Sequence, residues 1–215
     1  MTTQSSKAPK AKKRSYHHGD LRSALLAASE KILESEGIQA LTLRAAARAV
    51  GVSHTAPQNH FKDLTGLLSE LAAVGYQRFC AALRDAAAKS AADTKDDSSK
   101  RVGKAYVQFA RSHPGVFALM FRSEKLDAEH PGLRTAIDAA RQVLRETSSP
   151  LEHAASPLAL TAAGVARWSL VHGFAVLLTE GRLSGVVNSL PDKTTTDDLL
   201  DSVLNALRVD LGHDE

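Results

Sequence analysis

The fold is decided by the stretch Thr42-Leu-Arg-Ala-Ala-Ala-Arg-Ala-Val-Gly-Val-Ser-His-Thr-Ala-Pro-Gln-Asn-His-Phe61, which predicts two short helices joined by a glycine turn. In its first half, apolar residues recur at the spacing of a helix with one buried face: Leu43, Ala46, Ala47 and Val50. Thr42 precedes this face as an N-cap, and Gly51 follows it, where a helix end commonly needs positive φ. The first predicted helix therefore lies between Thr42 and Gly51.

The second half of the stretch predicts the second helix of the pair. Ser53 or Thr55 can cap this helix, and Pro57 then falls in its first turn, where a missing N–H costs little. The result is a helix-turn-helix. Because helical hairpins with a glycine between them also occur in all-α proteins of other kinds, the pattern by itself leaves that alternative open.

Charge is segregated along the chain. Residues 1–62 hold ten Lys or Arg and four Asp or Glu, whereas residues 63–215 hold seventeen and twenty. The helix-turn-helix thus lies in the basic end, as expected if only that end attracts a polyphosphate. Residues 1–15 contain no acidic residue and no apolar periodicity. They are expected to be disordered, either as a solvated tail or as an arm that contacts DNA.

The length and composition indicate a soluble protein with a sizeable core. A folded chain of 215 residues can bury about 70% of its unfolded surface. No apolar run approaches the roughly 20 residues of a membrane span, and no apolar segment follows the basic N-terminus. We therefore expect a cytoplasmic protein that does not contact a membrane. The single cysteine, Cys80, lies in an apolar helical pattern and is interpreted as a core residue rather than a redox sensor.

Helical patterns continue on both sides of the central stretch. A helix is predicted from Leu21 to about Glu36, with Asp20 as N-cap and Gly37 as the stop. A long helix capped by Asp63 is predicted to continue to about residue 90. The polar residues 93–100 are predicted to form the loop after it.

The remainder of the chain is also helical by pattern. Ser156 and Pro157 mark one helix start, and Thr196 is the predicted cap of the last helix, after a linker that includes Gly185 and Pro191. No window shows sustained alternation with a period of two, so the predicted fold class is all-α. The predicted helices in this part are 102–113, 115–121, 133–147, 157–181 and the segment after Thr196.

Several of these features together resemble the TetR family of bacterial transcriptional regulators. They are the capped helix of small residues, Gly-Val-Ser at 51–53, His-Phe at 60–61 and the leucine-rich helix that follows. The opening Tyr16-His-His-Gly-Asp20 and the segment Arg-Trp-Ser-Leu-Val-His-Gly at 167–173 resemble the branch with a Trp-His-Gly C-terminal domain. The resemblance implies a three-helix head joined by a long helix to a C-terminal domain that dimerises and binds a small molecule.

The domain boundaries expected from this resemblance are a basic arm at 1–15, a DNA-binding domain at 16–62 and a regulatory and dimerisation domain at 63–215. Thr42 looks like the family's helix cap and backbone contact, and Phe61 like its core anchor. Two positions depart from the family pattern. Gln58 stands where the family usually has Tyr, and Leu64 where it has a phosphate-contacting Lys or Arg. Both of the family's backbone contacts therefore lack their usual side chain in this sequence, although Lys62 can supply the second.

We predict that amide side chains of the second helix read bases, since an amide can pair bidentately with adenine in the major groove. Gln58 and Asn59 are assigned this role, and Arg44 and Lys62 are assigned to phosphates. The predicted DNA-binding residues are Thr42, Arg44, Ser53, His54, Thr55, Gln58, Asn59, His60 and Lys62 in the head, and Lys12, Lys13 and Arg14 in the arm.

Large apolar side chains of the C-terminal part form a candidate pocket for an apolar small molecule. The alternative is that they fill the core, and we interpret Trp168 and His172, which share a helix face, first as a packed pair. The candidate ligand-binding residues are Phe109, Phe117, Met120, Phe121, Trp168, His172 and Phe174. The helices from Pro157 and Thr196 present apolar stripes that predict a homodimeric four-helix bundle, with Leu200, Leu204 and Leu207 at the interface.

Enzyme and metal motifs are not recognisable in the chain. It has no Gly-x-Ser-x-Gly, no His-Glu-x-x-His and no phosphate-binding glycine loop, and its nine histidines are scattered. The adjacent His17 and His18 do not converge on one ion, so a capping or backbone-contact role is favoured over a metal site. No catalytic residue, metal or cofactor is expected.

The sequence therefore predicts a sequence-specific DNA-binding regulator, a repressor released from its operator by a small molecule. One alternative is a non-specific architectural DNA-binding protein that acts by charge alone. The other is an unrecognised small all-α enzyme.

Overall fold

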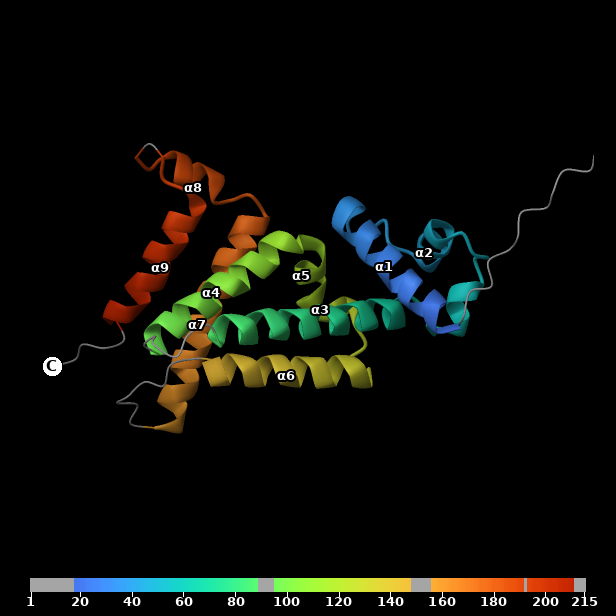
Figure 1. The fold of residues 1–215 in the computed structure, drawn as a ribbon, viewed down its shortest axis with the longest axis horizontal. Helices are drawn as coiled ribbons and strands as arrows, with labels where there is room; N and C mark the ends of the chain where they lie inside the picture. Colours follow the sequence, from blue (N-terminus) through green and yellow to red (C-terminus); the bar gives the residue numbers. More distant parts are fainter. Residues whose placement is uncertain (1–17, 89–94, 148–155, 192, 211–215) are drawn as a thin grey trace, which may run out of the picture.

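The computed structural model describes residues 18–88, 95–147, 156–191 and 193–210, and every regular element in them is a helix (Figure 1). The all-α prediction is confirmed. The elements are α1 (His18–Glu36), α2 (Leu43–Val50), the 3-10 helix η1 (Ala56–Asn59), α3 (Leu64–Ala87), α4 (Lys95–Ser112), α5 (Pro114–Met120), the 3-10 helix η2 (Ser123–Lys125), α6 (Pro131–Thr147), α7 (Pro157–Thr179), α8 (Ser184–Asn188) and α9 (Thr196–Asp210). The predicted arm, with Lys12, Lys13 and Arg14, lies outside the described residues, as does His17.

Two predicted helix starts are confirmed by their caps. The Asp63 carboxylate accepts the Gly66 N–H at 2.8 Å at the start of α3, and the Ser156 hydroxyl accepts the Ala159 N–H at 3.2 Å at the start of α7. Both side chains occupy backbone donors that a first helical turn leaves without partners. Gly37, with φ 81°, ends α1 as predicted.

Three predicted boundaries are wrong. α1 begins at His18, so Asp20 lies inside its first turn rather than at the cap. Residues 95–100 are helical rather than a loop, because the start of α4 packs on the end of α3, where Arg101 Nε donates to the Ala86 carbonyl at 3.0 Å. The cap of α9 is Thr195, one residue earlier than predicted. Its hydroxyl accepts the Asp198 N–H while Asp198 accepts the Thr195 N–H, which is a capping box.

The long helix α3 connects two hydrophobic cores. Near its start, Leu67 joins a small core with Leu25, Ala46 and Phe61, which holds α1 and α2 together as a head. Farther along, α3 runs beside α6 and packs against α4 in the larger core, which lies mostly in the C-terminal domain and also includes Ile32, Leu33 and Leu41 of the head (Figure 1). The head is therefore carried on one end of a rod whose remainder belongs to the other domain.

The short helix α5 joins the head to the C-terminal domain. The Glu34 carboxylate of α1 accepts the N–H groups of Gly115 and Val116 at 2.8 and 2.9 Å, at the first turn of α5. A Cβ at Gly115 would lie 2.8 Å from the Leu33 carbonyl oxygen, so only glycine permits this approach. Glu34 and Gly115 thus fix α5 directly on α1.

Candidate DNA-binding surface and regulatory domain

The turn of the helix-turn-helix has the geometry that its sequence predicts. The Thr42 hydroxyl accepts the Ala45 N–H at 3.0 Å at the start of α2. Gly51 closes α2 with φ 76°, and the N–H groups of Gly51 and Val52 bond to the Arg48 and Ala47 carbonyls at 3.1 and 3.0 Å. These bonds satisfy the last carbonyls of α2 and reverse the chain toward η1.

The second helix of the pair is η1, a 3-10 helix of four residues rather than the expected α-helix. Neither Ser53 nor Thr55 caps η1, because neither hydroxyl accepts a backbone N–H from its first turn. The two hydroxyls instead lie 3.2 Å from each other. Pro57 lies in the first turn as predicted and is buried. Since Pro57 and Phe61 both point into the head, the side chains between them are held at the surface.

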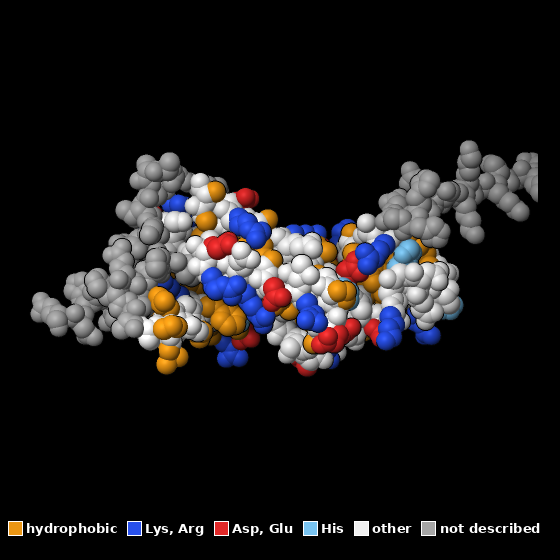
Figure 2. All heavy atoms as spheres, turned by 90° about the horizontal axis from the view of Figure 1, so that it is seen from below, with side chains coloured by type: hydrophobic (Ala, Val, Ile, Leu, Met, Phe, Trp, Pro, Cys, Tyr) orange, Lys and Arg blue, Asp and Glu red, His pale blue; other side chains and the backbone are white. Residues whose placement is uncertain are grey.

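The predicted contact residues surround η1 on the exposed side of the head. All of the following are exposed except His60, which is half-buried: Thr42, Arg44, Ser53, His54, Thr55, Gln58, Asn59, His60 and Lys62. Arg48, which the sequence analysis left out, is also exposed and lies one turn after Arg44 on α2. Its spacing of four residues from Arg44 is the sequence feature that could have identified Arg48 as a further contact residue. Figure 2 shows Lys, Arg and His side chains together at this end of the molecule.

The predicted ligand-binding side chains lie together, but they pack against one another. Phe109, Phe117, Met120 and Phe174 are buried in the larger core. The ring centroids of Phe117 and Phe121 are 5.1 Å apart, and those of Phe121 and His172 are 4.4 Å apart. We call these rings, together with Phe79, Tyr106, Phe109 and Trp168, the aromatic cluster. The core-filling alternative thus describes their arrangement in this conformation.

A polar network crosses the aromatic cluster at Tyr106. The Trp168 indole Nε1–H donates to the Tyr106 hydroxyl at 3.2 Å, and the same hydroxyl lies 3.0 Å from His172 Nδ1. The indole can only donate, so Tyr106 is the acceptor in that bond, and the direction of its bond with His172 follows the tautomer of the imidazole. Burial lowers the pKa of His172 and raises that of Tyr106, which favours the neutral form of each side chain.

The apolar stripe on α7 is exposed, whereas that on α9 is not. The exposed fractions of Leu158 and Val165 on α7 are 78% and 51%. Leu200 and Leu204 of α9 are buried within the chain, where Leu204 packs on Gly103 of α4. Their own chain already covers both side chains, which argues against a place for them at the predicted dimer interface. The side chain of Leu207 lies outside the described residues.

One helix bears on the expectation that no apolar run approaches the length of a membrane span, but a single helix of this kind does not by itself indicate a span. Within the described residues one helix, α7, is long and apolar enough to cross a membrane by length and composition, with a mean hydropathy of 1.3. Only 22% of that apolar window is buried. Figure 2 shows orange side chains gathered at the end away from the head, where α7 lies.

Titratable side chains do not form a metal site in the described part of the chain, where no group of three or more His, Cys, Asp or Glu lies together. Cys80 is buried among core side chains, and burial raises the pKa of its thiol. The interpretation of Cys80 as a core residue agrees with this position.

A family model and a sequence relative both match this chain. Residues 99–207 match the model of the tetracyclin repressor-like C-terminal domain. YobS, an uncharacterized HTH-type transcriptional regulator of Bacillus subtilis, is 30% identical over 158 residues, which cover 71% of this chain and 76% of YobS.

Solved structures agree with this match. A protein of unknown function from Rhodococcus sp. RHA1 is 28% identical, with a TM-score of 0.75 over 94% of this chain and all of the other. The TetR-like regulator LfrR from Mycobacterium smegmatis, solved in complex with proflavine, shares the fold at 18% identity, with a TM-score of 0.59 over 91% of this chain and 98% of LfrR. From the matched C-terminal domain and the relative of similar length, the chain belongs to the TetR family of DNA-binding transcriptional regulators.

Proposed function

We propose that this regulator binds a palindromic operator as a homodimer and represses transcription until a small molecule releases it. The observation that carries the proposal is the exposed surface around η1, fixed from behind by the buried Pro57 and Phe61. A surface that presents amides and cations from a rigid base is suited to a major groove, because contacts to base edges require fixed positions.

Within this surface, we assign base reading to Gln58 and Asn59 and phosphate contacts to Arg44, Arg48 and Lys62. The two amides lie on η1 itself, whereas Arg44 and Arg48 lie on the preceding helix. Thr42, Ser53, His54, Thr55 and His60 border this surface and complete the proposed interface. Loss of a phosphate contact should weaken binding to all sequences alike, and loss of an amide should change the preferred sequence.

The proposed dimer forms through α7. Its exposed apolar side chains need cover that this chain does not provide, and a second copy supplies a matching surface. Cβ atoms at Gly164 and Gly173 would meet nothing within 4 Å, so both positions leave room for another helix to approach. The exposed large apolar residues of α7 are Leu158, Leu160, Val165, Trp168 and Leu177. A dimer, rather than a membrane, is thus our explanation for the apolar character of α7, and we place the protein in the cytoplasm.

The proposed effector is a mostly apolar molecule that enters the aromatic cluster. Trp168, which is 42% exposed, and the half-buried Phe121 and His172 are its outermost rings, so they are the ones that must move. The cluster also contains Phe117 of α5, whose first turn bonds to Glu34. A ligand that separates these rings therefore acts on the helix that fixes the head. The effector must prefer the released conformation, since equal affinity for both shifts nothing.

Selection of bound DNA from a random pool tests the main proposal. We expect a palindromic consensus, with half-sites about one helical turn or a small multiple apart. Gln58→Ala should change the consensus, whereas Lys62→Ala, the matched control, should keep it and lower affinity. Salt-dependent binding with no sequence preference would instead identify the architectural alternative. The family consists of regulators, and we assign no catalytic residue.

A further inference from the structure

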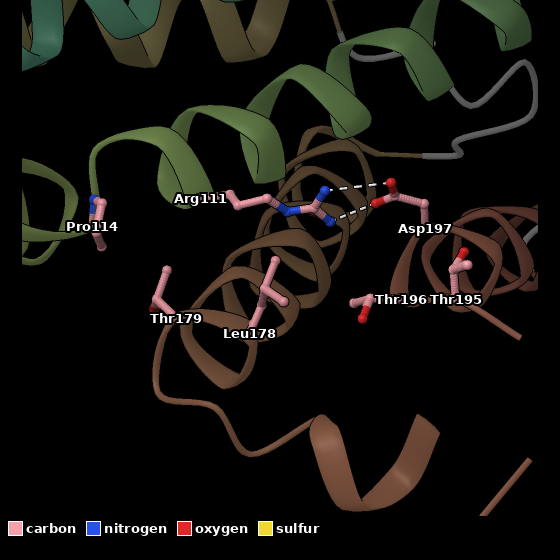
Figure 3. Close-up of a pocket in the computed structure, with 7 residues that line it drawn as sticks. All are labelled: Arg111, Pro114, Leu178, Thr179, Thr195, Thr196 and Asp197. Carbon is pink, nitrogen blue, oxygen red and sulfur yellow. Dashed lines mark hydrogen bonds and ion pairs between the residues drawn. The ribbon is translucent and has the colours of Figure 1, made fainter. Parts of the chain in front are cut away.

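A hollow of about 440 Å³, partly open to solvent, lies between the end of α4 and the start of α9, against the end of α7 (Figure 3). It contains none of the residues predicted for ligand binding. The residues that line it are Arg111, Pro114, Leu178, Thr179, Thr195, Thr196 and Asp197. Its volume lies within the range of small-molecule sites, which is roughly 300–1,000 Å³.

The hollow has one cation, and that cation faces a carboxylate. Arg111 donates two hydrogen bonds to Asp197, at 2.5 Å from Nη2 and 3.3 Å from Nη1 (Figure 3). This paired geometry is the one in which a guanidinium recognises any planar carboxylate. Asp197 therefore occupies the position that the carboxylate of a ligand would take.

The position of Asp197 allows a ligand to displace it from Arg111. Its side chain is 68% exposed, so it returns to water when it leaves Arg111. The hydrogen bond to Arg111 lowers the pKa of Asp197, and the neighbouring Asp198 carboxylate offsets part of that attraction by repulsion. Asp198 itself is held by Thr195 in the cap of α9. An exposed pair of this kind is a weak competitor, because solvent screens the attraction and both side chains lose freedom when paired.

The other lining groups define the rest of a ligand. Leu178 supplies apolar surface beside the guanidinium, and Pro114 lines the opposite side of the hollow, past the Arg111 backbone. The hydroxyls of Thr179 and Thr195 already donate to acceptors within the chain. Among the described residues the Thr196 hydroxyl has no such bond, so it remains for a ligand oxygen. One cation, one hydroxyl and a short apolar wall suit a monoanion with a small apolar body.

We propose that this hollow is a binding site for a small monocarboxylate, which displaces Asp197 from Arg111 and packs its apolar part on Leu178 and Pro114. The site is separate from the aromatic cluster. Pro114 lies directly before Gly115 and Val116, whose N–H groups bond to Glu34 of the head. A ligand here thus contacts the start of α5. Any effect on DNA release rests on the proposed function, whereas binding itself does not.

Calorimetric titration of the full chain with benzoate tests the proposal at constant ionic strength in chloride buffer. The two matched variants Asp197→Asn and Arg111→Gln both lose the same ion pair, and they differ in whether the cation remains. We expect Asp197→Asn to bind benzoate about fivefold more tightly than the original chain. In the original chain benzoate must first displace Asp197 from Arg111, and a weak exposed ion pair lowers the affinity by about that factor. Arg111→Gln should bind at least tenfold more weakly than Asp197→Asn, and uncharged benzamide should not bind.

The proposal is wrong if benzoate fails to bind Asp197→Asn, or if it binds Arg111→Gln as tightly as the original chain. Equal binding of benzamide would also overturn it, since the carboxylate would then play no part. No DNA is present in this titration. Its failure would leave the operator proposal intact, and a failed operator selection would leave the benzoate result intact.

Discussion

The small core of the head is formed by Leu25, Ala46, Phe61 and Leu67. The core of the C-terminal domain instead contains a cluster of aromatic rings with a buried hydroxyl at its centre. In the head, the turn that presents the η1 surface is fixed by bonds between residues at most five positions apart, as at Thr42 and Gly51. In the C-terminal domain, Tyr106 bonds to residues 62 and 66 positions away. The surface proposed to read DNA is thus built locally, and the domain proposed to respond to an effector is built from distant parts of the chain.

Replacement of Phe61, which anchors the core of the head, should have the largest effect. It should unfold the head and leave the C-terminal domain folded. Phe61→Ala deletes a buried ring from a small core, and we expect a loss of about 3–5 kcal/mol in the stability of the head. Operator binding and part of the helical circular dichroism should be lost. The single tryptophan, Trp168, lies in the C-terminal domain, so its fluorescence should stay unchanged. If its emission changed together with the helix signal, the two regions would form one cooperative unit.

The next largest effect distinguishes side chains that stabilise a single chain from those that form the proposed dimer interface. Leu204→Ala should lower the free energy of unfolding by about 2–5 kcal/mol and leave the dimer intact, because this side chain packs on α4. Val165→Asp, on exposed α7, should change the stability of the isolated chain by only about 0.5 kcal/mol and abolish the dimer. Urea unfolding and light scattering measure the two properties. The reverse outcome would return the interface to α9.

A smaller effect is expected at the centre of the aromatic cluster. Tyr106→Phe removes the hydrogen bonds to Trp168 and His172 together, and should lower the free energy of unfolding by about 1–3 kcal/mol. Tyr76→Phe is the matched control, since its buried hydroxyl makes one bond, to the Met120 carbonyl at 2.8 Å. It should cost about 1 kcal/mol. Equal losses in the two variants, measured by urea unfolding, would show that the network contributes no more than one bond.

The smallest expected effect depends on pH. Burial lowers the pKa of His172 from its usual 6.5, so the folded chain binds fewer protons at this ring than the unfolded chain. The resulting stability is present above pH 6.5 and is lost as the pH falls through the lowered pKa. Replacement by glutamine, His172→Gln, should flatten this part of the stability curve. Identical slopes below pH 6.5 in the two chains would mean that His172 does not contribute.

The features predicted from the sequence are those that depend on near neighbours. Thr42 and Gly51 could be identified because capping and a left-handed turn are properties of a few adjacent residues. The same reasoning failed at Thr196, where two threonines compete for the cap and the partner, Asp198, favours the earlier one. It also failed at 95–100, because contact with the end of α3 outweighs the local preference of polar residues for a loop.

The sequence could not predict which surface an apolar stripe would contact. Leu204 and Val165 both belong to apolar helices, and nothing in either pattern indicates that the first faces α4 and the second faces solvent. Tyr106 was not singled out for a related reason. Its position in an amphipathic segment predicts burial, and only the fold brings its hydroxyl to Trp168 and His172.

The length of α3 turns small motions into large ones. A helix of 24 residues is about 36 Å long, since each residue rises about 1.5 Å. If its far end is the pivot, a tilt of about 5° moves the head by roughly 3 Å, close to the 3.4 Å rise of one nucleotide along a strand. Two heads that tilt in opposite senses change their separation by about twice that amount. In the proposed dimer, a tilt of a few degrees at the C-terminal end of α3 would therefore be enough to take both proposed reading surfaces out of register.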